Sequence, residues 1–108
     1  MDPRIETLLT LIRDDPAREY DVDALAQTAN ISASHLRHLF KSQTGLTPAQ
    51  FIKQVRMEMA EQLLRTTFLS VKEIMNRVGV LNQSYFSREF RKMYGMAPGE
   101  YRRTERNR

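Results

Sequence analysis

Two stretches of the chain follow one pattern, and their spacing decides the fold. Residues 34–51 read SHLRHLFKSQTGLTPAQF, and residues 84–101 read SYFSREFRKMYGMAPGEY. This offset of 50 residues brings seven pairs into register: Ser34 with Ser84, Leu36 with Phe86, Phe40 with Phe90, Lys41 with Arg91, Gly45 with Gly95, Pro48 with Pro98, and Phe51 with Tyr101. Glycine and proline seldom coincide in this way by chance, so the pattern indicates an internal structural repeat.

The repeat continues towards the N-terminus with a small change of register. At an offset of 49 residues the apolar positions align: Val22 with Val71, Leu25 with Ile74, and Ala29 with Val78. Each copy therefore reads as a short helix, a turn, a longer basic helix, a glycine stop and a helix opened by proline. The second copy has one extra residue in its turn. A short helix, a tight turn and a longer helix form a helix-turn-helix unit.

Helical spacing of apolar residues runs through most of the chain, and strand alternation is nearly absent. Cap residues precede the expected helices at Asp2, Asp21, Ser32, Thr47 and Ser70. We predict an all-α fold of seven helices, in which two helix-turn-helix subdomains are joined by a long linker helix. The predicted divisions are a first unit at 1–46, the linker helix at 47–65, a second unit at 66–103 and a basic flexible tail at 104–108.

The predicted buried faces follow from the same spacing. The linker helix, from about 48 to 64, is expected to bury Phe51, Ile52, Val55, Met59 and Leu63. The longer helix of the second unit is expected to bury Phe86, Phe90 and Met93. His35 is expected to pack against the first unit.

Charge is distributed unevenly along the 108 residues. The net charge is +4, but residues 1–31 hold three basic and seven acidic side chains, whereas residues 32–108 hold fourteen basic and six acidic ones. A basic region behind an acidic N-terminal part indicates a polyanionic partner. No apolar run approaches the roughly 20 residues that a membrane span requires, and no secretory signal is visible.

Motifs for metal binding and catalysis are absent from the sequence. There is no cysteine, and the two histidines, His35 and His38, have no third ligand of suitable type nearby. No glycine-rich phosphate loop, H-E-x-x-H pattern or Cys-His pair is present. We expect no metal site, no cofactor and no enzymatic activity.

The faces of the two longer helices that avoid the predicted core carry side chains of the kinds that can read DNA. In the first, these are Ala33, Ser34, Arg37, His38 and Lys41, and in the second Asn82, Gln83, Ser84, Ser87, Arg88 and Arg91. Arginine, asparagine, glutamine and serine supply the donors and acceptors that pair with base edges in the major groove. Residues 32–45 contain no acid, and only Glu89 interrupts residues 82–96. A helix face that only contacts solvent would usually carry both acidic and basic side chains.

The sequence from about Ile5 to Arg102 resembles the AraC/XylS family of transcription regulators, most strongly in the second unit. The residues that carry the resemblance are Ser70-Val71-Lys72-Glu73-Ile74, Val78-Gly79, the run from Gln83 to Lys92, then Gly95, Pro98 and Tyr101-Arg102. Two core positions depart from the family pattern. Val80 stands where an aromatic residue is usual, and Met75 stands where alanine is usual.

This resemblance implies a role for each matching residue. Base contacts would come from Ser34, Arg37 and His38 in the first unit and from Gln83, Ser84, Ser87 and Arg88 in the second. Phosphate contacts would come from Lys41, Arg91 and Lys92, and from the helix starts at Ser32 and Asn82. The linker helix, at 1.5 Å per residue, spans about 25 Å, which suits two reading helices one DNA turn apart.

The function predicted is a sequence-specific double-stranded DNA-binding transcription regulator, with activation as the family's usual mode. We expect a cytoplasmic, nucleoid-associated bacterial protein that binds an asymmetric site as a monomer. RNA polymerase is a candidate second partner, and no membrane or small-molecule ligand is expected for this chain. The alternative is a helical protein-interaction module whose basic charge is incidental.

Overall fold

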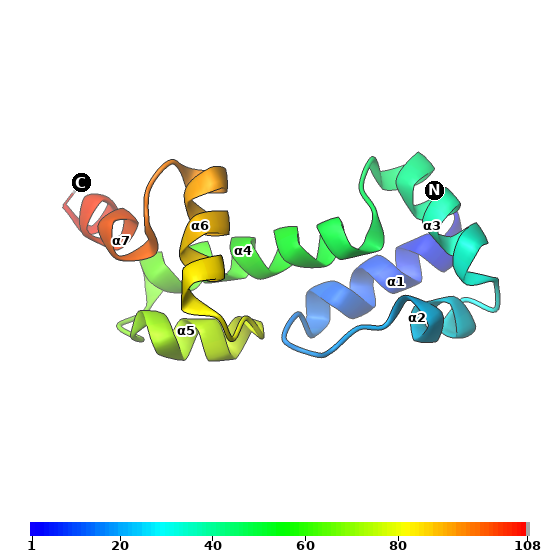
Figure 1. Ribbon diagram of the computed structural model, residues 1–108, viewed down its shortest axis with the longest axis horizontal. Helices are drawn as coiled ribbons and strands as arrows, with labels where there is room; N and C mark the ends of the chain where they lie inside the picture. The colour runs from blue at the N-terminus through cyan, green and yellow to red at the C-terminus, as the bar shows by residue number, and fades with distance from the viewer. Residues whose placement is uncertain (108) are drawn as a thin grey trace. The chain divides into compact units, whose positions relative to one another are not determined.

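The computed structural model describes residues 1–107, and this part of the chain contains helices and no strand (Figure 1). The seven helices are α1 (Pro3–Asp14), α2 (Val22–Thr28), α3 (Ala33–Thr44), α4 (Pro48–Thr66), α5 (Val71–Val78), α6 (Gln83–Tyr94) and α7 (Pro98–Arg106). The predicted all-α fold with two helix-turn-helix motifs is confirmed. In each motif a short helix, α2 or α5, leads through a tight turn to a longer one, α3 or α6.

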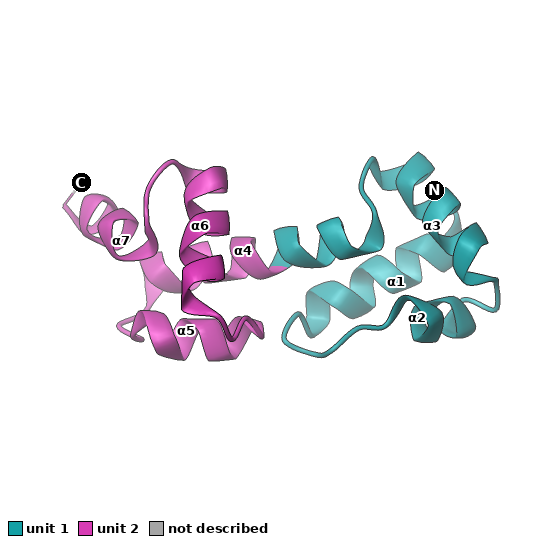
Figure 2. Cartoon of the chain, viewed as in Figure 1, with its two compact units in different colours: residues 1–55 teal, residues 56–108 magenta. Residues whose placement is uncertain are grey.

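The chain divides into two compact units, Met1–Val55 and Arg56–Arg108 (Figure 2). The boundary lies inside α4, the long helix that joins the two units. Its first half contributes Phe51 and Val55 to the core of unit 1. Its second half contributes a different set to the core of unit 2: Met57, Ala60 and Leu64. Of the predicted buried stripe, Phe51 and Val55 are buried, whereas Ile52, Met59 and Leu63 are half-buried and pack against the edges of the two cores.

Local capping interactions define where the helices begin. The Ser70 hydroxyl accepts a hydrogen bond from the Glu73 amide at 3.1 Å, and the Glu73 carboxylate accepts one from the Ser70 amide at 3.0 Å. These bonds lower the pKa of Glu73. Thr47 and Gln50 form the same reciprocal pair at the start of α4, with distances of 3.2 and 2.9 Å. The predicted caps Thr47 and Ser70 are therefore confirmed, and each forms a capping box with the residue three positions later.

The core of unit 1 forms where α1, α2, α3 and the start of α4 meet. Its largest fully buried side chains include Ile5, Leu8 and Ile12 from α1 and Leu36 and Phe40 from α3. The Phe40 and Phe51 rings pack edge to face with their centroids 5.6 Å apart. Aromatic pairs of this geometry contribute beyond the area that they bury. This core fixes the face of α3 that is turned inward.

The core of unit 2 is built around an aromatic cluster. Phe90 lies with its ring centroid 6.0 Å from that of Phe86, 4.7 Å from Tyr94 and 5.4 Å from Tyr101. Met93, which we expected inside, is 42% exposed. Glu89 is buried in α6 instead. The prediction for Met93 fails because the aromatic rings of α6 and α7 already fill the space beside Phe90.

The end of the chain differs from the predicted flexible tail. Helix α7 continues through residues 104–106, and Arg108 lies outside the described residues. The Arg102 side chain donates to the Leu64 carbonyl at 3.2 Å, and Arg106 donates to the Leu64 and Thr67 carbonyls. Carbonyls at the C-terminal end of a helix lack partners within the helix, so these arginines stabilise the end of α4. Nearby, burial and a 2.6 Å hydrogen bond to Glu61 raise the pKa of Tyr101 to about 12.

Glycine closes both longer helices in the left-handed conformation. Gly45 has a φ of 79° and Gly95 a φ of 84°. A Cβ atom added at either residue would meet nothing within 4 Å, so only backbone strain opposes a side chain there.

Gly95→Ala is therefore expected to lower the free energy of unfolding by about 1–2 kcal/mol, the cost of the left-handed conformation for an L-residue. Gly99→Ala is the matched control, since Gly99 lies in α7 and its added Cβ would be 3.8 Å from the Arg103 side chain, an ordinary contact. Alanine is a better helix former than glycine, so the control should be neutral or stabilising. Urea denaturation followed by circular dichroism measures both. Equal stability of the two variants would contradict this account of the glycine stop.

Candidate nucleic-acid interface

Helix α3 presents its predicted DNA-reading residues to solvent. Ser34, Arg37, His38 and Lys41 are all exposed. They lie on the side of the helix opposite Leu36 and Phe40, because residues three and four apart share a face. His35 is exposed as well, so the expectation that it packs against unit 1 is wrong.

Helix α6 presents the corresponding face in unit 2. The predicted residues Gln83, Ser84, Arg88, Arg91 and Lys92 are exposed, and Ser87 is half-buried. Phe86 and Phe90 hold the opposite face in the core. Each unit therefore presents one polar, cation-bearing face on the longer helix of its helix-turn-helix motif.

The two N-cap residues use their side chains within their own helices. The Ser32 hydroxyl accepts from the His35 amide at 3.0 Å, and the Asn82 carboxamide accepts from the Tyr85 amide at 2.8 Å. Phosphate contact at these positions would therefore be made by amides of the first helical turn. Amides there have no partner within the helix and favour anions.

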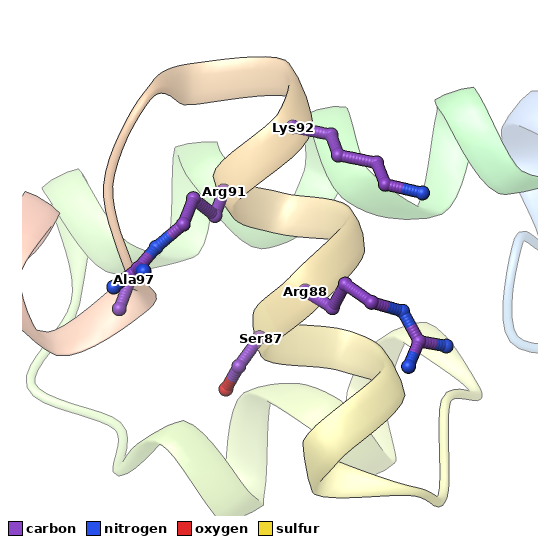
Figure 3. A pocket seen from close by; sticks show the side chains of 5 residues that line it. All are labelled: Ser87, Arg88, Arg91, Lys92 and Ala97. Atoms are coloured by element: carbon purple, nitrogen blue, oxygen red, sulfur yellow. The ribbon is translucent and has the colours of Figure 1, made fainter.

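A hollow lies beside α6, with a volume of about 430 Å³. Its lining residues are Ser87, Arg88, Arg91, Lys92 and Ala97 (Figure 3). Arg91 extends towards Ala97, the residue before the first turn of α7, whereas Arg88 and Lys92 extend away from it. Sequence reasoning did not select Ala97. The sequence Ala97-Pro98-Gly99 could have indicated this position, because it places a small residue with no capping side chain at the start of α7.

Glu89, the one acid in residues 82–96, is buried rather than displayed. Its carboxylate lies 3.1 Å from the Lys92 ammonium and 3.6 Å from the Arg88 guanidinium. The guanidinium of Arg88 also lies 5.7 Å from the centroid of the Tyr85 ring. These contacts restrict Arg88 and Lys92 to one side of α6. The acid thus orders the cations of this face and leaves the face itself basic.

Residues 1–107 contain neither a metal-binding cluster nor a membrane-spanning helix. No three acidic, histidine or cysteine side chains in this part of the chain converge as a metal site would require. None of its helices is both long and apolar enough to cross a bilayer.

Comparison with known proteins identifies the class to which this architecture belongs. Residues 25–104 match the family described as helix-turn-helix domain. The regulator MtrA of Neisseria gonorrhoeae is 34% identical over 102 residues, and the arabinose operon regulatory protein of Salmonella typhimurium is 35% identical over 103 residues. Each alignment covers 94% of this chain, but only 34% and 37% of the respective relative. The chain thus spans about a third of the length of the curated relatives it matches.

Solved structures agree with the sequence comparison. The DNA-binding domain of AdpA, determined in complex with a target DNA, superposes with a TM-score of 0.91 at 28% identity, covering 96% of this chain and 94% of that domain. The C-terminal domain of AraT, a response regulator from Geobacillus stearothermophilus, gives a TM-score of 0.87 at 32% identity, covering 95% and 86%. The chain belongs to the AraC-type helix-turn-helix family of DNA-binding transcription regulators.

Proposed function

We propose that this chain binds double-stranded DNA in a sequence-specific manner and serves as the DNA-reading part of a transcription regulator. Helices α3 and α6 each enter a major-groove segment of the same duplex. The base contacts are made by Ser34, Arg37, His38, Gln83, Ser84, Ser87 and Arg88. The phosphate contacts are made by Lys41, Arg91 and Lys92, with the helix starts at Ser32 and Asn82.

One observation carries this proposal: both units expose cations on the same helix of the same motif. Arg37 and Arg88 are both exposed on the longer helix, each opposite a phenylalanine core. A groove-binding helix needs this arrangement, because its inner side must pack while its outer side meets bases and phosphates. A helical protein-interaction module, the alternative, has no reason to repeat it in both halves.

The binding mode follows from two unlike reading faces in one chain. The first face combines serine, arginine and histidine, and the second combines glutamine, serine and arginine. A monomer therefore suffices to recognise an asymmetric site, whereas proteins with a single reading helix dimerise on palindromes. We further infer activation of transcription through RNA polymerase as the role of the whole protein, acting at the bacterial nucleoid in the cytoplasm.

Salt dependence tests the electrostatic part of the proposal. Three cations are assigned to phosphates, Lys41, Arg91 and Lys92. Each phosphate neutralised lowers the slope of log affinity against log salt concentration by about 0.9, so a slope near −3 is expected. Fluorescence anisotropy with a labelled duplex between low and moderate salt measures it. A slope near zero would rule out DNA binding of this kind.

The reading and phosphate roles are separable by substitution. Arg88→Ala is expected to cost on the order of 1–3 kcal/mol of binding free energy and to relax preference at one or two base pairs. Arg37→Ala should do the same at the other half-site. Lys92→Ala, one turn along α6, should instead weaken all sequences about equally and reduce the salt slope by about one. Site selection from a random DNA pool measures each preference, and an unchanged preferred sequence in both arginine variants would contradict the assignment.

A further inference from the structure

The turns of the two helix-turn-helix motifs differ by one residue, and the structure identifies which one. In unit 1 the Ile31 amide donates to the carbonyl of Ala26, five residues back, at 3.0 Å. In unit 2 the Val80 amide donates to the carbonyl of Met75, also five residues back, at 3.0 Å. Ile31 and Val80 are therefore equivalent. The cap Ser32 follows Ile31 directly, so Leu81, which separates Val80 from the cap Asn82, is the additional residue.

The additional residue does not contribute to the core. Val80 is 7% exposed and belongs to the core of unit 2, as Ile31 packs against that of unit 1. The Leu81 side chain is 83% exposed. It lies next to the N-cap Asn82, two residues before the first residue of α6, so it adds an exposed apolar group beside the helix end that carries Gln83 and Ser84.

Its neighbours make this end of α6 unlike the start of α3. Tyr85, four residues after Leu81, is 36% exposed and lies 5.7 Å from the Arg88 guanidinium, measured to the centroid of the ring. Leu81 precedes the N-cap Asn82 and so lies outside α6, whereas Tyr85 and Arg88, three residues apart, are neighbours on the helix. The position of Tyr85 is taken in unit 1 by His35, a polar side chain. An apolar contact beside an arginine is therefore particular to unit 2.

Only one apolar group is displayed by bases in the major groove, the 5-methyl group of thymine. Arginine pairs most often with guanine in the same groove. On the proposed DNA-binding function, we propose that Leu81 contacts the methyl group of a thymine in the half-site that α6 reads. The second half-site thus depends on a methyl group, and the first does not.

Deoxyuridine provides a direct test, because it removes the methyl group and keeps the base pairing of thymine. In a duplex carrying the preferred site, each thymine is replaced in turn by deoxyuridine, and affinity is measured by anisotropy. One replacement in the second half-site is expected to lower the affinity of the unaltered protein for the duplex about fourfold. This factor corresponds to the burial of one methyl-sized group. Leu81→Ala should bind the thymine duplex about fourfold more weakly and lose the distinction between thymine and deoxyuridine.

Phe68→Ala is the matched control, since Phe68 is 92% exposed in the same unit and lies outside the reading face. It should retain the full sensitivity to deoxyuridine. The inference is overturned if both proteins still bind the preferred site but every deoxyuridine replacement changes the affinity of the unaltered protein and of Leu81→Ala by the same factor. If the random pool yields no preferred site at all, the proposed function itself fails, and the two failures are thereby distinguished. Melting curves of both variants, each altered at an exposed side chain, verify folding.

Discussion

Inserting five base pairs between the two half-sites is expected to reduce the affinity to that of a single unit, a loss of about 10²–10⁴-fold. This factor is the gain in affinity that two linked binding modules obtain when both engage one target, and the insertion removes it. Five base pairs rotate one half-site by half a helical turn about the DNA axis. The two major-groove segments then lie on opposite sides of the duplex and cannot both face one protein. The units are joined through α4, Pro48–Thr66, which contains no glycine and no proline after its first residue. Bending the DNA to restore contact would cost on the order of 1–6 kcal/mol.

A ten-base-pair insertion is the informative companion to this experiment. It restores the rotational phase and lengthens the gap by one DNA turn. Units joined by a flexible segment would tolerate it, whereas units joined by an uninterrupted helix should not. Gel-shift titrations of the spacing series measure the affinities, and sedimentation of the complex gives its stoichiometry. A dimer on a palindromic site, or indifference to five inserted base pairs, would contradict the proposal that one chain reads both half-sites.

Phe90→Ala is expected to have the largest effect on stability, lowering the free energy of unfolding by about 3–5 kcal/mol. Phe90 is fully buried, and its ring contacts those of Phe86, Tyr94 and Tyr101. Removing it leaves a cavity at the point where α6 and α7 meet. Guanidinium denaturation followed by tyrosine fluorescence measures the loss, since two of the three contacting rings are tyrosines.

The control for this experiment is again Phe68→Ala. The Phe68 ring is exposed and its contact is with the Arg106 guanidinium, 4.3 Å from the ring centroid. An exposed cation–π contact contributes about 0.5–1 kcal/mol, so the variant should be nearly as stable as the parent. Comparable losses in the two variants would show that the aromatic cluster does not hold unit 2 together.

Local sequence signals predicted the helices well because those signals act within one or two turns. The caps Ser32, Thr47 and Ser70 and the stops Gly45 and Gly95 are each satisfied by bonds or backbone angles of adjacent residues. The interiors of helices were predicted less well. Which side of a helix is buried depends on partners far along the chain, and periodicity alone does not identify them.

Two of the wrong predictions, for Met93 and for residues 104–106, concern positions that depend on such distant partners. Met93 is exposed because rings from α7 fill the core beside Phe90, and residues 104–106 are helical because Arg102 and Arg106 bind carbonyls of α4 and the Thr67 loop. The proposed reading residues on α3 and α6, apart from the half-buried Ser87, were placed correctly on exposed faces because local helix geometry is enough to determine this. The hollow beside Arg91 was missed, since Ala97 enters it from the next helix.

The division of the protein inside α4 has a practical consequence for exchanging DNA specificities between relatives. Domains usually meet in exposed linkers, and chimaeras are joined there. Here the core of unit 1 ends with Val55 and that of unit 2 begins with Met57. A hybrid that takes one half from each parent should therefore be spliced in the middle of a helix, between Val55 and Met57, with the helix length preserved. Splicing at either loop flanking α4 would instead pair one parent's helix with the other parent's core.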